Sequence, residues 1–86
     1  MDIREYVRGQ LNFARQYAVN GEVELVKMII HQTDGAVEFY WMEHMYDPCE
    51  SREAREEVNK NRNWWENEVY PLFLNELRTA SMIERV

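Results

Sequence analysis

Apolar residues in the first twenty positions recur every three or four residues, and this spacing constrains the fold more than any other feature. At about 100° per residue, residues so spaced share one face of a helix. They are Ile3, Tyr6, Val7, Leu11, Ala14, Tyr17 and Ala18. Asp2 is a suitable N-terminal cap, with Glu5 three positions later, and Asn20-Gly21 supplies a left-handed stop. The pattern predicts an amphipathic helix over residues 2–19.

Residues 22–46 allow two interpretations. As a helix, residues 22–32 gather their apolar side chains in one arc, which is the cleaner pattern. As a hairpin, Thr33-Asp34-Gly35 would be the loop and residues 36–46 the second strand. The helical interpretation makes Asp34 the cap of a third, short helix. Its inward-facing residues would then be Phe39, Met42, Met45 and Tyr46.

The second half of the chain is predicted to form one long, mostly polar helix. Asp47-Pro48 ends the preceding element, because the residue before a proline is pushed out of the helical region. Ser51 then caps a segment whose first part, residues 52–63, has only two apolar residues. Pro71 removes a backbone hydrogen bond and predicts a kink or break near residues 67–70. The last residues, 79–86, are expected to fray.

These elements predict a single all-α domain over residues 1–86, with three or four helices and a long C-terminal helix kinked at Pro71. The alternative is an α+β fold with the hairpin at residues 22–46 flanked by helices. A chain of 86 residues makes one domain, and its core is modest in size.

The charge balance narrows the classes of partner. There are 16 acidic and 10 basic side chains, for a formal net charge of −6. This argues against direct nucleic-acid binding, which needs clustered Lys and Arg, and it permits a basic partner surface.

Cys49 is the only cysteine, so the fold needs no disulfide. The first ten residues lack a signal-peptide core, and no stretch approaches the roughly 20 apolar residues of a membrane span. We expect a cytoplasmic protein with no membrane contact.

The residues that could carry catalysis or bind a metal form no known motif. His31, His44 and Cys49 are ligand types for a transition metal, with Glu43 nearby in sequence. Their spacing matches none of the common ligand patterns, and no third group is present to orient a cysteine nucleophile. The sequence therefore predicts no metal and no cofactor.

Two adjacent tryptophans mark the candidate binding surface. Trp64 and Trp65 lie about 100° apart on a helix, so one narrow interface cannot hold both. Trp65 shares a stripe with Val58, Val69 and Leu72 and should face the core. Trp64 is then either packed by another element or exposed as a binding anchor. The residues expected to contact a partner are Trp64, Tyr70, Phe73 and Leu74.

We therefore expect a non-enzymatic protein-binding module. It would be an inhibitor or adaptor of a larger, basic partner, such as a nucleic-acid-binding complex of the phage or mobile-element type. One alternative is a structural homodimer subunit. The other is a small metal-dependent or cysteine-based enzyme.

Overall fold

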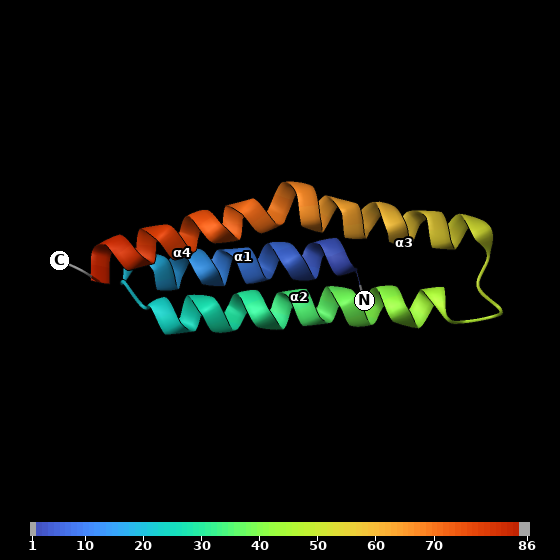
Figure 1. The fold of residues 1–86 in the computed structure, drawn as a ribbon, viewed down its shortest axis with the longest axis horizontal. Helices are drawn as coiled ribbons and strands as arrows, with labels where there is room; N and C mark the ends of the chain where they lie inside the picture. The colour runs from blue at the N-terminus through green and yellow to red at the C-terminus, as the bar shows by residue number, and fades with distance from the viewer. Residues whose placement is uncertain (1, 85–86) are drawn as a thin grey trace.

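Three helical rods lie side by side in the computed structural model, which describes residues 2–84, and each runs antiparallel to the one before it in the chain (Figure 1). The first rod is α1 (Ile3–Val19) and the second is α2 (Val23–Met45). The third is continuous and consists of α3 (Arg52–Trp64), a π turn η1 (Trp65–Val69) and α4 (Tyr70–Glu84). The described residues contain no strand. The predicted all-α class is confirmed, and the hairpin alternative at residues 22–46 does not occur.

The predicted ends of α1 are found as expected. The Asp2 side chain accepts hydrogen bonds from two backbone N–H groups of the first turn, at 3.0 and 3.3 Å. At the other end, Gly21 has a φ of 69°, in the left-handed region. The Gly21 N–H donates to the Ala18 carbonyl, and the Glu22 N–H donates to the Tyr17 carbonyl. This bonding satisfies the last carbonyls of the helix and turns the chain directly into α2.

Helix α2 passes without interruption through Thr33-Asp34-Gly35, so the predicted third short helix is wrong. Thr33 is fully buried, and its hydroxyl donates to the Ile29 carbonyl at 2.7 Å. Val37, one turn later, is also buried. These core contacts outweigh the local preference of the three residues for a turn, as tertiary packing commonly does. Asp34 is not a helix cap, because it lies in the interior of α2; its carboxylate instead accepts a hydrogen bond from Trp65.

The third rod contains an irregular turn where the sequence predicts a kink or break. Ser51 begins the rod as predicted, its hydroxyl accepting from the Ala54 N–H at 3.1 Å. Farther along, the Tyr70 N–H donates to the Trp65 carbonyl, five residues back instead of four. The helix therefore widens just before Pro71 and continues beyond it, and Figure 1 shows the widened turn bulging away from the bundle.

The π turn keeps both halves of the rod facing the core. The buried residues Val58 and Trp65 are seven positions apart, and so are Phe73 and Ala80. Trp65 and Phe73 are eight apart, so the repeat contains one extra residue. A π turn accommodates one extra residue within a helix.

Helix α4 continues through part of the segment that the sequence predicts to fray. It reaches Glu84, so residues 79–84 are helical. Residues 85 and 86 lie outside the described part of the chain.

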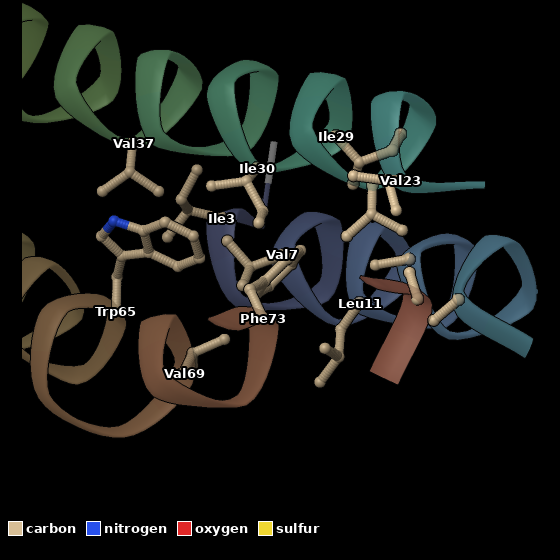
Figure 2. Packing of buried hydrophobic residues seen from close by; sticks show 14 residues of the cluster. Ile3, Val7, Leu11, Val23, Ile29, Ile30, Val37, Trp65, Val69 and Phe73 are labelled. Atoms are coloured by element: carbon tan, nitrogen blue, oxygen red, sulfur yellow. The ribbon is translucent and has the colours of Figure 1, made fainter. Parts of the chain in front are cut away.

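The core is built around the indole of Trp65. Figure 2 shows this ring reaching from the third rod toward Val37 of α2, with Ile3 and Ile30 nearby. Trp65 and Phe73 are the largest fully buried side chains. Burial of a large apolar side chain contributes about 1.5–3 kcal/mol, so these two are among the main contributors to the core.

The three rods differ in length, and this leaves one end of the bundle thinner. The molecule measures 53 × 17 × 15 Å. Helix α1 has 17 residues and α2 has 23, so α2 and α3 extend beyond the start of α1 as a two-helix hairpin (Figure 1). Within residues 2–84, no helix combines the length and apolar character needed to cross a membrane.

Candidate protein-binding surfaces

Trp65 lies in the core, as predicted. Its Nε1–H donates to Asp34 Oδ1 at 3.0 Å, which links the third rod to α2. Its ring contacts Tyr70 and Phe73 edge-on, with centroids 5.6 and 5.3 Å apart. Phe73 is fully buried and therefore cannot be part of an exposed binding surface. Its prediction as a partner contact is wrong, because the π turn rotates it into the core.

Trp64 is half-buried, packed by another element, which was one of the two predicted alternatives. The Arg4 guanidinium lies 4.8 Å from the centre of its ring, and that of Arg8 lies 5.5 Å away. Arg4 also donates to Asn61 Oδ1 at 2.7 Å. Each cation–π contact contributes about 0.5–1 kcal/mol at an exposed site. Arg4 and Arg8 thus cover Trp64.

Tyr70 lies on the flank of the third rod beside α2, Leu74 follows one helical turn later, and both are partly exposed. Tyr70 lines a hollow of about 260 Å³ that contains no residue of α1. Trp64 instead lines hollows shared with α1. The four residues predicted to bind a partner therefore form two separate surfaces and one core position. Leu72, expected in the core stripe, is exposed.

The hollow beside Tyr70 combines carboxylates with aromatic rings, and we call it the cation hollow. Asp34 and Glu66 are exposed at its wall, and the rings of Trp65 and Tyr70 form another part of it. Glu66 also pairs with Arg62, with 3.3 Å between Oε1 and Nε. The complete lining is Ile30, His31, Asp34, Trp65, Glu66 and Tyr70. It contains no Lys or Arg, so it suits a positively charged group.

A second surface lies on the outer side of α2. Phe39, Met42 and Tyr46, predicted to face inward, are 68%, 46% and 72% exposed. The prediction is wrong because it assumed a helix break at Asp34. Since α2 is unbroken, the face that carries Thr33 and Val37 remains the buried face along the helix. Phe39, Met42 and Tyr46 lie on the other side.

The weak metal candidates do not converge. His31 lines the cation hollow, whereas His44 lies at the hairpin end, with its Nδ1 3.0 Å from Glu50 Oε2. The two histidines are thirteen residues apart on one helix, which separates them by about 20 Å. Cys49 is exposed in the loop that follows α2. Among residues 2–84, no group of three His, Cys, Asp or Glu side chains could hold a metal ion.

Comparison with known proteins adds no family assignment. No protein-family model matches the chain, and no curated protein and no solved structure matches it either. The cation hollow and the exposed side of α2 are therefore the basis for a functional proposal.

Proposed function

We propose that this domain is a non-enzymatic protein-binding module that takes a basic side chain of its partner into the cation hollow. The observation that carries the proposal is the composition of this hollow, in which two exposed carboxylates and the partly exposed ring of Tyr70 surround about 260 Å³ of space, with the buried indole of Trp65 beneath them. Aromatic faces attract cations, and carboxylates form strong, charge-assisted hydrogen bonds with guanidinium groups.

The contacts around Asp34 favour this use. Its Oδ1 accepts from the buried indole of Trp65, which holds the carboxylate at the wall of the hollow. An ionised carboxylate can accept about four hydrogen bonds, so capacity remains for a guanidinium. Tyr70 stands edge-on to Trp65, at 64° between ring planes. An arginine could therefore lie against Tyr70 while donating to Asp34.

The wider surface supports the same class of partner. The net charge of −6 would steer a basic protein toward the domain. Leu74, one turn beyond Tyr70, is partly exposed and would extend the contact with an apolar side chain. As part of this proposal, the domain is a cytoplasmic inhibitor or adaptor of a basic, nucleic-acid-binding partner.

The experiment is an NMR titration with N-acetyl-arginine-amide, using the indole N–H resonances as reporters. The Trp65 indole donates to Asp34 at the hollow, whereas the Trp41 indole donates to Asn59 at the hairpin end and serves as internal control. We expect the Trp65 resonance to shift in a saturable manner, with a millimolar Kd, equivalent to about 4 kcal/mol. N-acetyl-citrulline-amide has the same shape without the charge and should produce no saturable shift.

Paired variants test whether the carboxylates are responsible. Asp34→Asn and Glu66→Gln together should abolish the Trp65 shift, since both keep the side-chain shape and remove the charge. Glu66→Gln also breaks an Arg–Glu pair at four-residue spacing, so Glu56→Gln, which breaks the equivalent pair with Arg52, is the matched control. Equal responses to the arginine and citrulline compounds, or an unchanged response in the double variant, would exclude the proposal.

A further inference from the structure

Helix α2 is apolar on two faces, and only one of them faces the core. The second face, which we call the free face, follows an alternating spacing of three and four residues. It consists of Leu25, Met28, Gln32, Gly35, Phe39, Met42 and Tyr46. This spacing keeps residues on one side of a helix and is typical of helices that pack lengthwise against another helix.

The free face has the composition of an interface core. None of its seven residues is charged, although 30% of the chain is charged. Met28, Phe39, Met42 and Tyr46 are all substantially exposed. Depletion of charge and enrichment of aromatic residues and methionine distinguish the centres of protein interfaces from other surfaces. A helix that is apolar on opposite sides is ordinarily covered on both.

Gly35 lies at the middle of the free face, and the isolated chain gives no reason for a glycine there. A glycine inside a helix costs about 1 kcal/mol relative to alanine. A Cβ added at Gly35 would meet no atom within 4 Å. The missing side chain would matter if a second helix crossed at this point, because two backbones can approach closely only where a side chain is absent.

We propose that the free face binds the free face of a second copy of this chain, in an antiparallel dimer with its two-fold axis at Gly35. Met28 and Met42 lie seven residues before and after Gly35. An antiparallel two-fold pair therefore brings Met28 of one copy to Met42 of the other, and places Gln32 beside Phe39. The face is complementary to itself, which is the requirement of an isologous dimer.

The absence of charge selects this occupant over a basic partner. None of the seven residues of the free face is a carboxylate, although Glu24 and Glu43 lie at its edges and Glu43 shares a hollow with Phe39. Two copies of an uncharged face meet without like-charge repulsion inside the contact. The dimer uses no residue of the cation hollow, so it stands independently of the proposed function.

The experiment is sedimentation equilibrium of the full chain from micromolar to submillimolar concentration, because this measurement gives mass independently of the elongated shape. We expect the mass to rise from one chain to two. Met42→Glu should weaken association by at least about tenfold, since it buries a charge in each half of the contact. Met82→Glu is the matched control, because Met82 is also exposed but belongs to α4, and it should leave association unchanged.

Gly35→Ala tests whether the two copies meet at Gly35, because it should change monomer stability and dimer association in opposite directions. It should raise the stability of the monomer while weakening the dimer. Gly9→Ala is its control, because Gly9 is another helical glycine with no atom within 4 Å of an added Cβ, and it lies on α1. A wild-type chain that stays monomeric throughout, or equal effects of Gly35→Ala and Gly9→Ala on association, would overturn the dimer. Neither result would affect the arginine titration.

Discussion

The hydrogen bond between Trp65 and Asp34 joins the third rod to α2, and a double-mutant cycle measures its strength. The cycle compares Trp65→Phe, Asp34→Ala and the double variant. Trp65 is only 2% exposed and its ring contacts both Tyr70 and Phe73. Removing a buried Trp or Phe side chain down to alanine costs about 3–5 kcal/mol. Since phenylalanine retains one ring, we expect Trp65→Phe to cost about 2–3 kcal/mol.

The coupling between the two positions follows from the chemistry of the bond. A hydrogen bond to a charged group contributes about 1.5–3 kcal/mol. Asp34 is exposed, however, so water already solvates its carboxylate and reduces the net gain. We expect a coupling of about 1 kcal/mol. Asp34→Ala should itself cost about 1–2 kcal/mol, because it leaves the indole N–H buried without its partner.

Urea unfolding followed by far-ultraviolet circular dichroism provides the four free energies of unfolding. The Trp41–Asn59 bond is a useful comparison, because its length of 2.9 Å is similar but both its ends are neutral and it is exposed. Its coupling should be about 0.5 kcal/mol or less. If the Trp65 and Asp34 variants are additive within about 0.3 kcal/mol, this hydrogen bond does not stabilise the fold and our reasoning is refuted.

Three further predictions concern helix ends and glycines, each measured as a change in the free energy of unfolding by urea. Gly9→Ala should stabilise the monomer by about 0.5–1 kcal/mol, because the added Cβ enters open space in a helix interior; a loss of stability would contradict this. Gly21→Ala should destabilise by about 1–3 kcal/mol, because φ is 69° and the added Cβ would lie 2.9 Å from Ile83 Cγ2. Ser51→Ala should cost about 1 kcal/mol by removing the cap bond, whereas Ser51→Asp should retain most of the stability.

The helix ends could be predicted from the sequence because they depend on contacts between near neighbours. The Asp2 and Ser51 caps bond to backbone groups two or three residues away. The turn at Gly21 depends on carbonyls in the preceding turn of α1. In each case the residues that determine the structure lie within one helical turn, so the local sequence contains the whole cause.

The course of α2 could not be predicted in the same way. Thr33-Asp34-Gly35 favours a turn locally, but Thr33 is buried and Asp34 bonds to Trp65, thirty-one residues away. These distant partners cannot be identified by periodicity. A helix break wrongly placed at Asp34 also assigns Phe39, Met42 and Tyr46 to the wrong face, because the direction of each side chain is counted from the start of its helix.

The positions that follow the π turn could not be predicted from a uniform helix. At 100° per residue Leu72 lies in line with Val58 and Trp65, whereas in the structure Leu72 is exposed and Phe73 is buried. The spacing itself contained the information. Val58 to Trp65 and Phe73 to Ala80 are seven-residue steps, and the step between them is eight. The eight-residue step contains Pro71, so the change in the repeat coincides with the proline.

Both proposed surfaces involve α2, and their combination has a consequence for affinity. A single cation hollow holding one arginine is expected to bind only at millimolar concentration, which is weak for a partner in a cell. An antiparallel dimer would present two such hollows in a fixed relation. A partner with two suitably spaced basic side chains would then bind the second hollow at high effective concentration. Met42→Glu should therefore weaken the binding of such a bivalent partner while leaving N-acetyl-arginine-amide binding unchanged, since it removes the dimer and preserves each hollow.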